Sequence, residues 1–509
     1  MATQQSLFDA TRFDPTRSEL PRVELVHSLA KATDVIIGLA NPRERPTLVG
    51  APAELESRLE RNQSLLNLLL EQGAGPATDE SALLILGGLR VIAVGLGDDL
   101  DVSPEELRQA AGWGVRRALA IRSPGPRRIA ISLEATSKTQ IRAAAEGALL
   151  ACDQFSKLSH QPSDQMVEAI WLVGQARVAQ QAIETARIVA QAVAVARDWS
   201  NLPANLLGPA EMADQARSYL RDARLNVEVL DERALEKGGY QGILAVGGGS
   251  TRPPRLLRMA YHPRGARKHL VLVGKGITYD SGGFNLKPGA SLLTMKHDMA
   301  GAAAVICALR AIVQCGLAVR VTAYAPLAEQ MISGSAYRPG DVLRMFDGTT
   351  VENSDSDCEG RIVLADALAR AGQDEPDLLV DVATLTGACM VALGTRMAGL
   401  MASDDATADR LLDAAEAAGE DFWQLPITDE VRKRLKSRVA DLRSKDDRHG
   451  GALFAAAFLQ HFVADQTPWA HLDIAGPAWN RAAAHDYVPV DATGFGVRTL
   501  VALAESLAG

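Results

Sequence analysis

Short apolar runs alternate with longer amphipathic segments along the first part of the chain. The runs have strand length and cover residues 82–87, 90–97 and 128–133. A helix is predicted to begin after Ser103, which is a suitable N-cap, with Pro104 at the first helical position and Glu106 at the third. We expect this helix to end near residue 119 and a second helix over residues 140–155. This order of elements predicts an α/β domain.

The second part of the chain alternates in the same way, with longer apolar helices. The predicted strands cover residues 269–274, 319–325, 378–384 and 469–475. The predicted helices cover residues 301–315, 361–371 and 451–463. Helices between successive strands imply a mostly parallel central sheet flanked by helices. Ligands of such sheets bind beyond the carboxyl ends of the strands, so the residues after each strand are the candidates for chemistry.

Residues 175–199 differ in composition from both flanks. They are rich in Ala, Gln and Val, contain no Pro or Gly, and predict one long helix that ends before Pro203. We interpret the helix as a connector between domains, and an ordinary packed helix is the alternative that this segment leaves open. The predicted organisation is a smaller N-terminal α/β domain at 1–174, a connecting helix at 175–200 and a larger C-terminal α/β domain at 201–509.

Composition narrows the class of protein further. The 509 residues carry a formal net charge of −9, which gives no general attraction to nucleic acid. Five cysteines without a CxxC pair are typical of free thiols in a reducing compartment. The N-terminus lacks the features of a signal peptide, and no apolar run is long enough to cross a membrane. We therefore expect a cytoplasmic protein that has no membrane partner.

Charged residues gather after the predicted strands of the second part. One strand leads into Lys275 and Asp280, and Asp298 follows just before a helix. Asp357 and Glu359 lie two residues apart, so both carboxylates of an extended loop would point to one side. Four carboxylates at one site repel one another unless cations neutralise them, and oxygen ligands suit Mg²⁺, Mn²⁺ or Zn²⁺. A neighbouring lysine can be a neutral amine ligand, because burial and a bound metal lower its pKa.

Each signal also has an ordinary structural explanation. A glycine-rich turn after a strand is commonly only a turn, and Asp-x-Glu before a helix is commonly an acidic first turn that the helix dipole favours. His297 is more commonly a packed or surface histidine than a ligand, and the nine histidines show no HExxH spacing. Arg361 at a helix start runs against the dipole preference, which favours a functional role.

Together these segments resemble the leucyl aminopeptidase family, also called cytosol aminopeptidases. The resemblance covers roughly residues 196–507 and rests on many motifs that occur in the expected order. The motifs are ANLLGP at 204, VGKGITYDSGG at 273, LKPG at 286, MKHDMAGAAAV at 295, MISGSAYRPGDV at 331, DSDCEGRIVLADAL at 355, DVATLTGA at 381, WAHLDIAG at 469 and DATGFGVRTL at 491. Residues 1–174 resemble the family's smaller N-terminal domain only in general pattern.

The resemblance implies a metallo-aminopeptidase that removes N-terminal amino acids from short peptides. It implies two divalent metal ions, Mn²⁺ or Zn²⁺, with the ligands Lys275, Asp280, Asp298, Asp357 and Glu359. Asp280 and Glu359 would contact both ions, Asp357 would belong to one site, and Lys275 and Asp298 would belong to the other. In this family the ions bind the substrate's α-amine and scissile carbonyl oxygen and activate the attacking water.

Two basic residues match the family's catalytic pair. Lys287 corresponds to the lysine that stabilises the oxyanion of the tetrahedral intermediate. Arg361 corresponds to the arginine that holds a bicarbonate, which acts as the general base. The implied side-chain pocket is small or apolar, suits Leu-like or Met-like N-terminal residues, and consists of Met295, Thr384, Gly387, Ala475 and Ala478. The resemblance also implies a homohexamer whose active sites face an internal cavity, which would admit only short, unfolded peptides.

The chain departs from the family pattern beside the presumed ligands. The family usually reads Asn-Thr-Asp-Ala-Glu-Gly-Arg, where this chain reads Asp-Ser-Asp-Cys-Glu-Gly-Arg from Asp355 onward. The charge of Asp355 either acts on the metals or only caps the following helix, and the sequence leaves both interpretations open. Cys358 is either an oxidation-sensitive thiol or a small buried filler, which is the favoured interpretation. Gln330 replaces another usual Asn near Glu329, and the sequence does not determine the effect of this change.

Two other classes of function remain open. Some members of this family also bind DNA, and the N-terminal domain would carry that activity. Its basic doublets, Arg116-Arg117 and Arg127-Arg128, more commonly form a solvated face, so nucleic acid is disfavoured as a partner. A pseudo-enzyme that kept only the scaffold is the third interpretation, and the complete set of ligands and catalytic residues argues against it.

Overall fold

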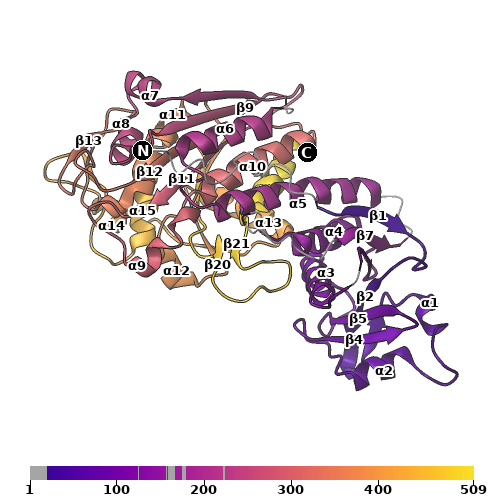
Figure 1. The fold of residues 1–509 in the computed structure, drawn as a ribbon. Coiled ribbons are helices and arrows are strands. Elements are labelled where there is room, and N and C mark those ends of the chain that lie inside the picture. Colours follow the sequence, from indigo (N-terminus) through magenta and orange to yellow (C-terminus); the bar gives the residue numbers. More distant parts are fainter. Residues whose placement is uncertain (1–19, 124, 156–157, 159–166, 175–178, 222–223) are drawn as a thin grey trace. The chain divides into compact units, whose positions relative to one another are not determined.

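The computed structural model describes residues 20–123, 125–155, 158, 167–174, 179–221 and 224–509, whose fold is shown in Figure 1. The polar N-terminus and the first residues of the expected connecting helix, 175–178, lie outside these residues. The described chain forms two compact units. The smaller unit contains the residues up to 194 and residues 481–490, and the larger unit contains residues 195–480 and 491–509.

The smaller unit is built on a seven-stranded sheet. Its strands are β1 (Arg22–Val26), β2 (Asp34–Ala40), β3 (Thr47–Val49), β4 (Ser81–Leu86), β5 (Leu89–Gly95), β6 (Arg127–Ser132) and β7 (Val167–Val173). The order is β1-β7-β6-β2-β5-β4, with β3 paired to β2. β3 and β4 are antiparallel to their neighbours, and the other pairs are parallel.

The helices of the smaller unit are η4 (Pro42–Glu44), α1 (Ala53–Glu56), α2 (Leu65–Glu71), α3 (Pro104–Leu119) and α4 (Lys138–Cys152). Two of them, α3 and α4, begin at capping boxes. At the start of α3, Ser103 Oγ accepts from the Glu106 backbone N–H at 3.2 Å, and Glu106 Oε2 accepts from the Ser103 N–H at 2.7 Å. This reciprocal pair satisfies two donors that the first helical turn leaves unbonded.

The second basic doublet of the smaller unit, Arg127-Arg128, is occupied by contacts within that unit. Arg127 is 1% exposed and lies 3.6 Å from the buried carboxylate of Asp34. Arg128 pairs with Glu168 at 2.9 Å. Arg127 therefore belongs to the interior of the unit and offers no charge to its surface.

The larger unit contains a nine-stranded sheet with the order β17-β16-β19-β15-β10-β12-β9-β8, and β11 pairs with β12. Its strands are β8 (Asn226–Leu230), β9 (Arg255–Tyr261), β10 (His269–Gly274), β11 (Gly276–Asp280), β12 (Arg320–Gln330), β15 (Leu378–Ala383), β16 (Ala398–Ala402), β17 (Phe422–Gln424) and β19 (Trp469–Asp473). The four central strands are parallel, whereas β9, β8 and β16 each run antiparallel to a neighbour. The predicted two-domain α/β class with a mostly parallel central sheet is confirmed.

Helices cover both faces of this sheet. The helices that belong wholly or partly to the larger unit are α5 (Ala179–Asn201), which begins in the smaller unit, and α6 (Pro209–Leu220), α7 (Glu232–Gly238), α8 (Gln241–Gly247), α9 (Gly289–Leu292), η5 (Met295–His297), α10 (Ala300–Gln314), η6 (Ser356–Cys358), α11 (Glu359–Gly372), α12 (Gly387–Leu393), α13 (Asp405–Ala418), α14 (Asp429–Lys433), α15 (Gly451–Gln460) and α16 (Val497–Ala508). Val271 and Val273 of β10 pack on the α11 side. Leu270 and Leu272 point to the opposite face, which α10 contacts.

Five short strands complete the larger unit. They are β13 (Val342–Arg344), β14 (Thr350–Glu352), β18 (Leu442–Arg443), β20 (Trp479–Asn480) and its partner β21 (Asp491–Ala492), the first three forming a small sheet. None of the five cysteines forms a disulfide, in agreement with the free thiols expected from the sequence. Within the described part of the chain, no helix combines the length and the apolar character needed to span a membrane.

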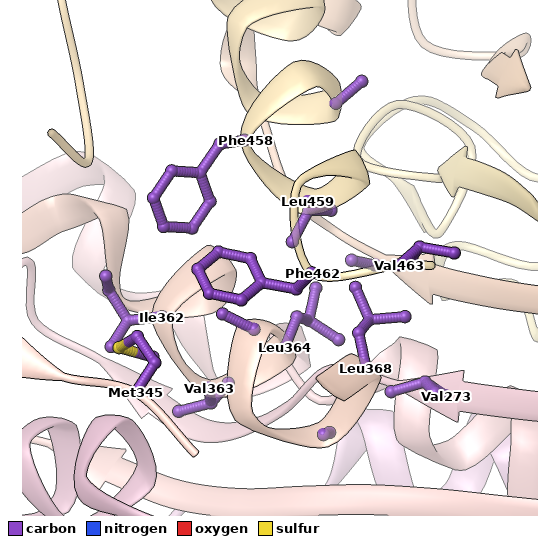
Figure 2. Packing of buried hydrophobic residues seen from close by; sticks show 14 of the residues in the cluster. Val273, Met345, Ile362, Val363, Leu364, Leu368, Phe458, Leu459, Phe462 and Val463 are labelled. Carbon is purple, nitrogen blue, oxygen red and sulfur yellow. The ribbon is translucent and has the colours of Figure 1, made fainter. Parts of the chain in front are cut away.

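The face of the sheet that carries α11 is packed by a continuous apolar core. Figure 2 shows side chains of α11 meeting those of α15 and of the residues just after it. The rings of Phe458 and Phe462 lie 5.2 Å apart, and Leu364 of α11 is fully buried near them. The first residue of α11 is Glu359, one of the candidate ligands. The core therefore fixes the helix that carries this ligand.

We predict that Leu364→Ala destabilises the larger unit by about 2–5 kcal/mol, because it removes a buried side chain and leaves a cavity. Chemical unfolding followed by circular dichroism measures the loss. Leu293→Ala is the matched control, since Leu293 is 83% exposed, and it is expected to change stability by no more than about 0.5 kcal/mol. Equal unfolding of the two variants would contradict the assigned core.

Candidate metal centre

Lys275 lies in the one-residue gap between β10 and β11. β12 pairs with β10 through residues 320–324 and with β11 through residues 327–330, so the chain steps sideways at this gap. The Lys275 backbone is held by the Val382 carbonyl at 3.0 Å and by the Ala302 N–H at 2.8 Å. Its side chain is 2% exposed and points into the cluster of carboxylates described next.

Asp280 ends β11 and is followed by a tight turn. Its Oδ1 accepts from the Gly282 N–H at 2.7 Å, and Gly282 has a φ of +84°, a conformation that glycine adopts without strain. The turn leads to Lys287, whose Nζ lies 2.8 Å from Asp280 Oδ2 and 2.5 Å from Asp357 Oδ1. The glycine-rich turn therefore places Lys287 beside the carboxylates of Asp280 and Asp357.

Asp298 follows η5 and faces the Lys275 ammonium. Lys275 Nζ lies 2.9 Å from Asp298 Oδ1 and 2.7 Å from Oδ2. Thr384, just after β15, donates its hydroxyl to Asp298 Oδ1 at 2.7 Å and accepts from Lys275 Nζ through its carbonyl at 3.1 Å. The ends of β10 and β15 thus position one half of the cluster.

Asp357 and Glu359 supply the other half at the start of α11. Glu359 is 2% exposed, and its Oε1 lies 2.9 Å from Lys275 Nζ. Carboxylate oxygens of Asp280, Asp357 and Glu359 all lie within 4.8 Å of one another. A Cβ at Gly360 would come within 2.5 Å of Lys275 Cε, so only glycine lets the lysine pass the helix start.

The electrostatics of the cluster reflect excess negative charge. Burial raises the pKa of Asp298 to about 6 against the opposing charge of Lys275. Burial and the charge of Glu359 likewise raise the pKa of Asp280 and of Asp357. Burial alone would lower the pKa of Lys287, but the charges of Asp280 and the other three carboxylates together outweigh it, so the pKa lies above its ordinary value.

The side chains present fit divalent cations. Four carboxylates face two lysines, so two negative charges are uncompensated when all six groups are ionised, as metal binding requires. Glu359 Oε2 is buried and has no hydrogen-bond partner among the described residues. A buried carboxylate oxygen without a donor is costly, and a cation would satisfy it. The donor set of carboxylate oxygens and one amine suits Mn²⁺ or Zn²⁺.

Arg361 lies two residues after Glu359, on the first turn of α11. It is 7% exposed, and its Nη1 donates to the Ser444 carbonyl at 2.5 Å. Its guanidinium carbon lies 5.9 Å from the centre of the Phe454 ring. Arg361 Nε is buried without a hydrogen-bond partner among the described residues, so it remains available as a donor.

The residues expected to line the substrate pocket come from three segments. Met295 begins η5, Gly387 begins α12, and Ala475 and Ala478 follow β19. His297 of η5 stacks on Trp479 at 4.8 Å, which brings the first and third segments together. Thr384 is the member that contacts the carboxylate cluster directly, through Asp298.

Asp473, at the end of β19, is a positioning residue that the sequence reasoning did not single out. Its Oδ2 accepts from the Thr386 hydroxyl at 2.7 Å, and its Oδ1 accepts from the Ala475 N–H at 3.2 Å. The buried carboxylate therefore ties the loop after β15 to the loop after β19. Its position at the carboxyl end of a strand was the signal that could have found it.

The departures from the family pattern all have defined positions. The Asp355 carboxylate accepts from the Asp357 N–H at 2.8 Å, so it caps η6, and it also pairs with Lys445. Cys358 is buried, and burial raises the pKa of its thiol to about 11, as suits an inert filler. Gln330 donates to the Tyr337 hydroxyl at 3.2 Å and to the Ser356 carbonyl at 2.5 Å, which supports the loop before Asp357.

Comparison with known proteins identifies the family. A family model described as "Cytosol aminopeptidase family, catalytic domain" matches residues 194–501, and the model of that family's N-terminal domain matches residues 38–162. A probable cytosol aminopeptidase of Cutibacterium acnes is 50% identical over 494 residues, covering 96% of this chain and 97% of the relative. One of Micrococcus luteus is 43% identical over 503 residues, covering 94% and 96%.

Solved structures agree with these matches. The bottromycin maturation enzyme BotP in complex with Mn superposes with a TM-score of 0.83 at 37% identity, covering 94% of this chain and 100% of that chain. A second structure of BotP gives a TM-score of 0.82 at 38% identity, covering 94% and 99%. Both family models, the relatives and the fold concur. The chain therefore belongs to the cytosol aminopeptidase family and is an aminopeptidase, a peptide hydrolase.

Proposed function

We propose that this aminopeptidase removes N-terminal residues from short peptides with two divalent metal ions, Mn²⁺ or Zn²⁺. The observation that carries the proposal is the buried cluster in which four carboxylates outnumber two lysines and Glu359 Oε2 lacks a donor. BotP, a similar structure, is in complex with Mn. Lys275, Asp280, Asp298, Asp357 and Glu359 would hold the ions. Bound there, the ions supply Lewis-acid polarisation of the scissile carbonyl and a lowered pKa of the attacking water.

Lys287 is assigned to stabilise the oxyanion that develops during attack. Its ammonium is held between Asp280 and Asp357, and its raised pKa keeps it charged at neutral pH. A fixed cation that is already oriented stabilises developing negative charge without reorganisation. The turn through Gly282 sets this position.

Arg361 is assigned to hold a small anion, bicarbonate, as the general base. One of its nitrogens is fixed by the Ser444 carbonyl, while its buried Nε has no partner among the described residues. An anchored guanidinium with a free N–H can bind an oxyanion through charge-assisted hydrogen bonds. The anion would accept a proton from the attacking water.

The preferred substrates are peptides with a Leu-like or Met-like N-terminus, since the assigned pocket consists of small or apolar residues. We further propose a homohexamer in the cytoplasm. Relatives named cytosol aminopeptidase and the unpaired cysteines support this location. The single most informative assay is a panel of aminoacyl-anilides tested with Mn²⁺, Zn²⁺, Co²⁺ and Mg²⁺ after chelation.

We predict that chelation abolishes hydrolysis of leucyl and methionyl anilides and that Mn²⁺ or Zn²⁺ restores it, because the carboxylates need cations to form a working site. Asp357→Ala should lose one metal ion per chain by elemental analysis. Full turnover by protein that elemental analysis shows to be free of metal would sink the proposal.

We predict that Lys287→Ala and Arg361→Ala each keep both metal ions but lose kcat by about 10²–10³-fold, as expected for the loss of one electrostatic stabiliser. Steady-state kinetics and elemental analysis of the same samples separate the two effects. Normal turnover in either variant means that its assigned catalytic role is wrong.

We predict a hexamer by light scattering at micromolar concentration, because the family's active sites face an internal cavity. The same samples are assayed for turnover at each concentration. A fully active monomer would contradict the cavity and its restriction to short peptides.

A further inference from the structure

The chain segment after β18 runs alongside the loop that carries two of the proposed ligands. β18 pairs in parallel with β14, and the Ser444 N–H continues this ladder by donating to the Glu352 carbonyl at 2.9 Å. Ser444 is fully buried, and its hydroxyl accepts from the Ser354 N–H at 3.0 Å. Residues 442–444 therefore lie beside residues 351–354, and the next residue of that loop is Asp355.

This segment provides the anchor of Arg361. The Ser444 carbonyl is the hydrogen-bond acceptor that the described structure gives to the Arg361 guanidinium. The contact joins residues that are 83 positions apart in the sequence. The position of the Ser444 carbonyl consequently decides where the guanidinium points.

The next residue ties the same segment to the metal loop. Lys445 forms an ion pair with Asp355 Oδ2, while Asp355 Oδ1 accepts from the Asp357 N–H at 2.8 Å. The Asp355 carboxylate thus has one oxygen on the backbone of a proposed ligand and the other on Lys445. Asp355 is 14% exposed and Lys445 is 41% exposed, so the pair lies at the edge of the site and not in its interior.

The far side of the segment is fixed as well. Asp446 lies 2.6 Å from Arg434 Nε and 2.7 Å from Arg443 Nη2. The Arg434 guanidinium lies 5.9 Å from the centre of the Phe454 ring, the same ring that Arg361 approaches. With Ser444 held by the ladder and Asp446 held by two arginines, Lys445 is the side chain of the segment that pairs with the carboxylate capping the ligand loop.

We propose that Lys445 and Asp355 form a positioning ion pair, which holds the Ser444 carbonyl and, through it, the Arg361 guanidinium in register with Asp357 and Glu359. The inference rests on the proposed function, since it assigns a role to two further residues of the same site. Lys445 touches neither the carboxylate cluster nor Arg361 directly, so it is a positioning residue. Such pairs add little to global stability because they are partly exposed, and their effect is on geometry.

The test uses four variants of the full chain: Lys445→Met, Asp355→Asn, the double variant, and Lys445→Arg. We expect Lys445→Met to lower kcat on the order of 10-fold, because misplacing a catalytic group slows the reaction. The loss should not be larger, since the β14–β18 ladder still holds Ser444. KM should stay within about 2-fold and both metal ions should remain, because the substrate pocket and the ligands are unchanged. The double variant should lose no more than Lys445→Met, since both changes remove one contact.

Two comparisons separate positioning from a general effect of charge. Lys445→Arg keeps the ion pair and should restore kcat. Lys268→Met is the matched control: it removes a partly exposed Lys–Asp pair, with Asp377 at 2.9 Å, from the opposite end of β10, and it should leave kcat unchanged. Circular dichroism and the unfolding midpoint confirm that each variant is folded.

If the wild-type protein is active and Lys445→Met has the same kcat, the positioning proposal is overturned and the proposed function stands. Loss of metal from Asp355→Asn, with metal retained by Lys445→Met, would also overturn it, because Asp355 would then act on the ions directly. A wild-type protein that fails to hydrolyse any aminoacyl-anilide with any metal would instead refute the proposed function. The three outcomes are distinguishable in one set of kinetics and elemental analyses.

Discussion

The mutual repulsion of four carboxylates, three buried and one half-buried, is the constraint that organises the larger unit. An ion buried without a partner costs several kcal/mol, so Asp280, Asp298, Asp357 and Glu359 could not converge without positive charge between them. Lys275 pairs with Asp298 and Glu359, and Lys287 pairs with Asp280 and Asp357, so the lysines offset half of the negative charge. The two charges that remain are the physical reason for expecting metal ions, independent of any relative.

The parallel sheet makes this convergence possible. Residues that are distant in sequence reach one point because β10, β15 and β19 end at the same edge, where Lys275, Thr384 and Asp473 lie. The step from β10 to β11 turns Lys275 inward, and α11 presents Glu359 and Arg361 on its first turn. The apolar core beneath α11, shown in Figure 2, holds that helix start in place. Fold and chemistry are therefore joined through one helix and three strand ends.

Local patterns were sufficient for several central elements, and they drew attention to the charged residues that follow the strands. Apolar periodicity predicted β10 and its flanking helices closely, and the capping pattern at Ser103 predicted the start of α3. The antiparallel edges β8, β9 and β16 were not predicted, because strand direction depends on pairing and not on composition. Lys445 and the Ser444 carbonyl could not be predicted either, since they reach the site from 90 and 83 positions away and one acts through its backbone.

The central claim is that the excess negative charge is balanced by two metal ions held by Lys275 and the four carboxylates. Anomalous diffraction from crystals grown with MnCl₂ tests it most directly, because it locates each ion without reference to activity. The account predicts two peaks per chain, about 3.5–4 Å apart, with Asp280 and Glu359 beside both. A single peak, or peaks that avoid these carboxylates, would contradict it.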